Sequence, residues 1–111
     1  MNIVVLSGRL GADVVNVSND IENVVAVGSI ATNEVYTDKS GVKHESVDWH
    51  SVIFFGSRGS VALQNLKKGM LVSVQGRINY VKYKGSDGVE YTKSQIVVND
   101  FTFQSQKINQ E

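Results

Sequence analysis

The segment SRGSVALQNLKK, residues 57–68, is the most informative about the fold, because it is the part of the sequence where apolar residues recur with a helical spacing. Its apolar stripe is formed by Val61, Ala62, Leu63 and Leu66. Ser57 or Ser60 is a candidate N-cap, and Gly69 is a natural stop after the last turn. The sequence therefore predicts one short helix over residues 57–68.

Outward from this helix, the apolar residues alternate with a period of two, which predicts strands. Strands are expected at residues 2–10, 23–32, 47–55, 70–83 and 90–103. Residues 36–44 (YTDKSGVKH) and 84–89 (KGSDGV) carry turn residues and predict hairpin tips. Gly28 lies inside the second strand, where it predicts a bulge or a sharp bend.

The predicted order is three strands, one helix and two strands. This order is typical of an all-β, five-stranded OB-fold barrel with one short helix between strands 3 and 4. A chain of 111 residues is long enough for one such domain. We expect the domain to cover residues 1–103 and a short polar tail to cover residues 104–111.

Composition excludes several classes of protein. No apolar run approaches the roughly 20 residues that a transmembrane helix requires. The apolar N-terminus has no basic start and no small-residue cleavage pattern, so we expect no signal peptide. The chain has no cysteine, which excludes disulfides and thiolate chemistry and fits a reducing, cytoplasmic location.

The net charge is zero, but the charge is unevenly distributed. Residues 1–50 carry three basic and seven acidic side chains, and residues 51–111 carry eight basic and four acidic ones. A neutral chain with a basic half can present a positive groove to a polyanion after folding. Lysines scattered only for solubility remain an equal alternative at this level.

Aromatic and cationic residues are interleaved in the second half of the chain. The fourth strand carries Arg77, Tyr80, Lys82, Tyr83 and Lys84, and the fifth strand carries Tyr91 and Lys93. Alternation places Arg77 and Tyr83 on one face and Tyr80 and Lys82 on the other. Rings for base stacking beside cations for phosphates are what an OB fold needs to bind single strands.

Other aromatic residues have two possible roles. Tyr36 lies next to a turn, beside Lys39 and Lys43, which favours recognition. Trp49 and Phe55 share one face of the third strand. From the residues alone, Trp49, Phe54 and Phe55 fit the core. Phe101 and Phe103 fit either the core or an interface.

Catalytic and metal sites find little support. Asp48 and His50 lie two residues apart on one strand and point the same way, but no nucleophile or second base accompanies them. His44 and His50, without cysteine, do not form a metal-ligand pattern. We therefore expect no catalytic residue, no metal and no cofactor. An OB-type nuclease that uses Asp48 and His50 stays as a minor alternative.

Several segments together resemble the bacterial single-stranded DNA-binding protein family over roughly residues 2–100. They are NIVVLSGRLGAD, IATNEVYTDK, VDWHSVIFFG, LKKGMLVSVQGRI and EYTKSQIVVN. The resemblance implies an OB domain that binds single-stranded DNA without much regard to sequence and serves replication, recombination and repair at the nucleoid. It also implies a homotetramer, with a dimer as the alternative.

The resemblance assigns roles to individual residues. It implies stacking on Tyr36, Trp49, Phe55 and Tyr83, and it therefore favours recognition over the core for Trp49 and Phe55. At Tyr36 and Tyr83 the family commonly has tryptophan, so this chain offers smaller rings there. The implied phosphate contacts are Arg9, Lys39, Lys43, Lys68, Arg77, Lys82 and Lys84. His50 is implied at a subunit interface.

The C-terminus departs from the family pattern. Family members typically continue into a flexible linker and an acidic tip that ends in phenylalanine and recruits other enzymes. Residues 108–111 (INQE) form no such tip. A short relative from a phage or mobile element and a chain whose tail was removed both fit, and recruitment through a tail is not expected. An OB-fold accessory protein, such as a primosomal or recombination mediator, that acts mainly through protein contacts remains the alternative function.

Overall fold

The computed structural model describes residues 1–18 and 22–104, so all of the predicted tail except Gln104 lies outside the described residues. Within these described residues, one helix and six strands follow one another. In order they are β1 (Val4–Leu10), β2 (Val15–Asn16), β3 (Val25–Thr37), β4 (Lys43–Phe55), α1 (Ser57–Asn65), β5 (Leu71–Lys84) and β6 (Glu90–Phe103). No helix in the described part of the chain is long and apolar enough to cross a membrane.

The sheet closes into a barrel. Strand β1 pairs antiparallel with β5 along most of its length and with β3 at Arg9 and Leu10. The circuit continues through the antiparallel pair β3–β4, the parallel pair β4–β6 and the antiparallel pair β5–β6. At the β1–β3 junction, a Cβ on Gly8 would lie 2.2 Å from the carbonyl oxygen of Ala31, so glycine permits this close approach. The predicted five-stranded OB barrel is confirmed, and β2 is a short addition to it.

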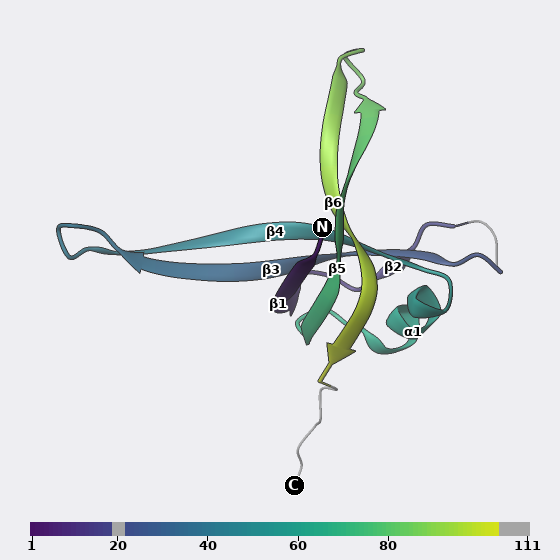
Figure 1. Ribbon diagram of the computed structural model, residues 1–111, viewed down its shortest axis with the longest axis horizontal. Coiled ribbons are helices and arrows are strands. Elements are labelled where there is room, and N and C mark those ends of the chain that lie inside the picture. The colour runs from purple at the N-terminus through teal and green to yellow at the C-terminus, as the bar shows by residue number, and fades with distance from the viewer. Residues whose placement is uncertain (19–21, 105–111) are drawn as a thin grey trace, which may run out of the picture.

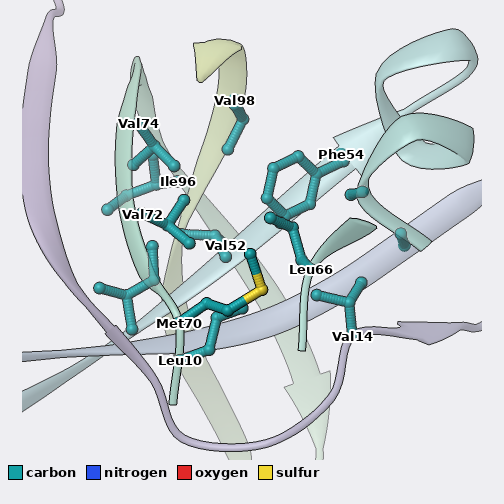
Figure 2. Close-up of a cluster of buried hydrophobic side chains, with 13 residues drawn as sticks. Leu10, Val14, Val52, Phe54, Leu66, Met70, Val72, Val74, Ile96 and Val98 are labelled. Carbon is teal, nitrogen blue, oxygen red and sulfur yellow. The ribbon is translucent and has the colours of Figure 1, made fainter. Parts of the chain in front are cut away.

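The core fills the inside of this barrel (Figure 2). It is made by apolar side chains that the alternation of each strand turns inward. Phe54 is fully buried and meets Phe101 edge to face, with ring centroids 5.0 Å apart. From α1 and the turn that follows it, Ala62, Leu66 and Met70 close one end of the core. The helix therefore acts as a plug for the barrel.

Two long hairpins extend beyond the barrel in different directions (Figure 1). We call them the β3–β4 arm and the β5–β6 arm. The radius of gyration is 16.4 Å, whereas a compact chain of this length has about 13 Å. The excess comes from the arms, whose strands pair as far as Thr37 with Lys43 and Lys84 with Glu90. The arms give a small domain a large exposed surface.

The structure corrects several details of the predicted elements. The helix ends at Asn65 instead of Lys68, so Lys67 and Lys68 follow it, and its N-cap is Gly56 instead of a serine. The β3–β4 register runs through Gly28 without a break. Gly28 instead faces Val14, 3.3 Å from where its Cβ would be, and the bulge lies between Gln75 and Gly76.

Candidate nucleic-acid interface

Trp49 and Phe55 lie on the outer face of β4. Since Val52 and Phe54 point into the core, alternation turns Trp49 and Phe55 outward. Their side chains are 61% and 46% exposed. The two rings are six residues apart, which corresponds to about 20 Å along the strand. Large aromatic groups left open to solvent in this way are available for stacking.

A row across three neighbouring strands places a cation near Trp49. Arg9 pairs with Ala31 of β3, and Ala31 pairs with Trp49 of β4. The guanidinium of Arg9 donates a hydrogen bond from Nη1 to the carbonyl oxygen of Gly69, 2.9 Å away. This bond holds the charge of Arg9 on the outer face of the barrel. Strand β3 lies between Arg9 and Trp49.

A cleft joins Trp49 to β6. The parallel register pairs Val52 with Ile96, and counting back along both strands places Trp49 opposite Lys93. The two strands separate here, and a cavity of about 180 Å³ opens between them, lined by Trp49, Lys93 and Gln95 among others. An aromatic face, an ammonium group and an amide thus line one open cleft.

The β5–β6 arm divides its candidate residues between two faces, as the sequence predicted. Tyr83 pairs with Tyr91, and their rings stack with centroids 5.6 Å apart. Arg77 and Lys93 lie at odd positions of the same ladder and share this face. Tyr80, Lys82 and Lys84 occupy the other face, all of them exposed.

The β3–β4 arm places Tyr36 and Trp49 on opposite faces of its ladder. Tyr36 pairs with His44, which is five residues from Trp49 along β4. Tyr36 is exposed, and its ring stacks on the imidazole of His44 with centroids 5.0 Å apart. A bound strand that contacts both Tyr36 and Trp49 must therefore follow the twist of the hairpin or cross its edge.

The predicted cations are all exposed but widely spread. Arg9 lies on the barrel, Lys39 and Lys43 at the tip of the β3–β4 arm, Lys68 after the helix, and Arg77, Lys82 and Lys84 on β5. The backbone N–H of Lys68 is held by the carboxylate of Asp13 at 2.8 Å, while its side chain is exposed. These cations lie on the barrel, on both arms and after the helix, and they do not form a single line.

His50 and Asp48 point the same way along β4, as the sequence predicted, but His50 has a different partner. The Nε2 atom of His50 hydrogen-bonds the hydroxyl of Thr32 at 2.8 Å. His50 is half-buried and lines the same cleft as Trp49. In residues 1–18 and 22–104, no group of three or more acidic, histidine or cysteine side chains is arranged to hold a metal ion.

Two aspartates at the hairpin tips have perturbed acidity. The pKa of Asp38 is lowered, chiefly by its hydrogen bond with His44 and then by the backbone N–H of Val42. The pKa of Asp87 is lowered by the hydroxyl of Tyr91 and then by the backbone N–H of Val89. In each case, hydrogen bonds from a backbone N–H of the turn and from an aromatic side chain favour the charged carboxylate.

The structure adds one residue to the candidates and gives two earlier ones specific neighbours. Gly11 is new, because a Cβ there would lie 2.3 Å from Cζ3 of the Trp49 ring. Lys93 was visible in the sequence beside Tyr91, but only the β4–β6 register brings it to Trp49. Tyr91 stacks on Tyr83. No single-residue signal in the sequence marks any of these contacts.

The barrel with its helical plug, two projecting arms and exposed rings defines a small OB-fold protein with an aromatic and cationic surface. The model of the single-strand binding protein family matches residues 1–104. The chain belongs to this family.

Two curated relatives show the extent of the likeness. The single-stranded DNA-binding proteins of Xanthomonas campestris pv. campestris and Neisseria meningitidis serogroup A are 38% and 39% identical over 100 residues. The match covers 90% of this chain and 58% of each relative. The chain thus matches little more than half of the length of these relatives.

Solved structures agree on the fold. The SSB of Plasmodium falciparum, solved in complex with ssDNA, superposes with a TM-score of 0.81 at 27% identity, covering 95% of this chain and 96% of its own. A deletion variant of the single-stranded DNA-binding protein from Thermus aquaticus also gives 0.81, at 22% identity, covering 96% of this chain and 52% of its own. The second likeness concerns the fold alone.

Proposed function

We propose that this chain binds single-stranded DNA without reading its sequence. Family membership supports this role, as do relatives that are named for binding single-stranded DNA. The observation that carries the proposal is the exposed indole of Trp49, which lines a cleft together with Lys93. A base can stack on the indole while the ammonium group neutralises the adjoining phosphate.

Binding would combine stacking and charge neutralisation. Tyr36, Trp49, Phe55 and Tyr83 would each stack a base, for about 1–3 kcal/mol per ring. The seven predicted cations and Lys93 would contact phosphates, so the affinity would fall as salt rises. Because every base has a π face, this mode of binding is independent of sequence.

The role is one of holding and protecting single strands, and it requires no bond to be made or broken. We assign the domain to residues 1–103 and propose that it acts in replication, recombination and repair, in the cytoplasm at the nucleoid. His50 is engaged with Thr32, which favours a structural use of this histidine over catalysis. Labelled single strands incubated with the protein and a divalent metal should stay intact, and cleavage would refute a purely binding role.

We further propose that the chain assembles with itself, as a homotetramer or a dimer, with His50 near a subunit contact. His50 is half-buried beside an open cleft, where a second copy could reach it. The His50→Ala variant should then shift sedimentation towards smaller species. Sedimentation of the wild-type chain as a monomer at all concentrations would remove this assignment and leave DNA binding untouched.

Gel-shift titrations of single-stranded and duplex DNA at two salt concentrations test the proposed function. We expect tighter binding of single strands and weaker binding at the higher salt concentration. Equal affinity for both forms would contradict it, because stacking on exposed rings requires unpaired bases. Weak DNA binding together with a tight protein partner would favour the accessory-protein alternative.

A further inference from the structure

The tips of the two arms share an arrangement that the sequence does not reveal. In each tip a candidate stacking tyrosine faces a second ring across the ladder, Tyr36 with His44 and Tyr83 with Tyr91. Both pairs are stacked, with interplanar angles of 18° and 27°. One face of each tyrosine is therefore covered by a ring from the neighbouring strand.

In the β3–β4 arm, a turn aspartate holds the second ring. Asp38 receives hydrogen bonds at Oδ1 from the backbone N–H groups of Ser40 and Val42, both at 2.9 Å. Its other oxygen, Oδ2, lies 2.8 Å from Nε2 of His44. The carboxylate thus ties the imidazole to the backbone of the turn.

The β5–β6 arm repeats this arrangement with different residues. Asp87 receives the N–H of Val89 at Oδ1, at 3.0 Å, and the hydroxyl of Tyr91 at Oδ2, at 2.7 Å. A Cβ on Gly85 would lie 2.7 Å from Cε2 of Tyr91, so the turn also packs closely against that ring. Tyr91 is restrained from two sides.

We propose that His44 and Tyr91 are positioning residues, which their turn aspartates fix so that each backs the ring of Tyr36 or Tyr83 and leaves its other face open to a base. This inference rests on the proposed function and deepens it. An unsupported tyrosine at an exposed arm tip must be ordered when a base binds, and ordering one side chain weakens affinity by about 2- to 12-fold. A tyrosine whose ring already stacks on a second ring avoids most of this loss of affinity.

A double-mutant cycle in the β5–β6 arm tests the proposal with oligo-dT as the probe. We expect Tyr91→Ala to weaken binding by about 2- to 12-fold and to have little further effect when Tyr83 is already alanine. Asp87→Ala, which leaves both rings in place, should show the same dependence on Tyr83. Tyr91→Phe should restore part of the affinity because it keeps the backing ring.

The other arm provides a matched control. Tyr91→Ala should keep its full effect in a Tyr36→Ala background, because Tyr36 is backed by His44 instead. The dependence of affinity on salt should not change in any of these variants, since they remove no cation. In the β3–β4 arm, His44→Ala should depend on Tyr36 in the same way, and His44→Phe should restore binding.

Two outcomes would overturn the inference, and a third would overturn the proposed function. If Tyr91→Ala and Asp87→Ala weaken binding equally with and without Tyr83, the rings act independently and the inference is wrong. If neither variant weakens binding although Tyr83→Ala does, backing does not matter and the inference is equally wrong. If the wild-type chain does not bind oligo-dT at all, the proposed function fails.

Discussion

The indole of Trp49 lies against the backbone of Gly11, so closely that a Cβ on Gly11 would be 2.3 Å from Cζ3 and 2.9 Å from Cη2 of the ring. Gly11 therefore makes room for the edge of the six-membered ring of the indole, while the side chain remains 61% exposed. At the second glycine of the GRLG segment, Gly11, the absence of a side chain therefore allows the indole to lie where it does. It also shows that the orientation of Trp49 depends on a residue far away in the sequence.

Replacing Gly11 with alanine should move the indole. Gly11 does not have a positive φ, so alanine fits the backbone, and the exposed ring can swing away at a cost below about 1 kcal/mol of folding free energy. We expect Gly11→Ala to weaken oligo-dT binding by up to about 1–3 kcal/mol, the value of one stacked base. Fluorescence titration and thermal unfolding measure the two effects, with exposed Ala12→Ser as the control. A large loss of stability without loss of affinity would contradict this role.

Phe54 and Phe55 are adjacent and should have opposite effects. Phe54 is fully buried against Phe101, so Phe54→Ala should lower the free energy of unfolding by about 3–5 kcal/mol. Phe55 points outward from the same strand, so Phe55→Ala should leave unfolding nearly unchanged and weaken binding by about 1–3 kcal/mol. Urea unfolding and DNA titration of both variants make the comparison. Equal losses of stability would show that both rings belong to the core.

Lys93 should contribute one phosphate contact beside Trp49. Removing it in Lys93→Ala should make the slope of log affinity against log salt shallower by about 0.7, the value for one contact on a single strand. Lys67, exposed after the helix and outside the proposed interface, provides the matched control. Titrations over a series of salt concentrations measure both slopes. The same slope for Lys93→Ala and wild type would remove Lys93 from the site.

The bond between Tyr91 and Asp87 has a predictable pH range. The hydrogen bond to Asp87 raises the pKa of Tyr91 above its usual value of about 10. The stabilising effect of this hydrogen bond is therefore complete below the usual pKa of tyrosine, and it is lost as pH rises through the raised pKa of Tyr91. The lowered pKa of Asp87 means that this group stabilises the turn above its ordinary pKa, and that the effect is lost as pH falls through the lowered value.

Ultraviolet titration of tyrosinate measures the upper limit of this range. Subtracting the curve of Tyr91→Phe isolates Tyr91, which should ionise later than a free tyrosine. Asp87→Asn should bring its ionisation back towards the usual pKa. Should Tyr91 ionise at the same pH with and without the carboxylate, the bond between these two residues does not persist in solution.

The sequence is sufficient to predict the barrel. The apolar residues recur with a period of two in the predicted strands and change to a helical period only once, at residues 57–68. It places the strand at 90–103 correctly, since turn residues bound it clearly. It underestimates the β3–β4 arm, because residues 33–37 and 43–46 are mostly polar and carry no burial pattern. Cross-strand pairs hold this part of the arm, and such pairs join residues that are distant in the chain.

The face that each ring occupies could be predicted only in part. Alternation establishes that Trp49 and Phe55 lie together and opposite Phe54, but either face could have been the inner one. The resemblance to a family favoured exposure, and the burial of Phe54 agrees with it. The ring pairs at the arm tips could not be predicted, since they depend on the exact register of each hairpin.

Trp49 is the only tryptophan of the chain, so its fluorescence reports whether this indole stacks on unpaired bases. Titration with oligo-dT should quench the emission of the wild-type protein, and Trp49→Ala should weaken binding, measured with a labelled oligonucleotide, by about 1–3 kcal/mol. Unchanged emission at saturating oligo-dT, together with normal binding by Trp49→Ala, would show that the indole does not stack on bases.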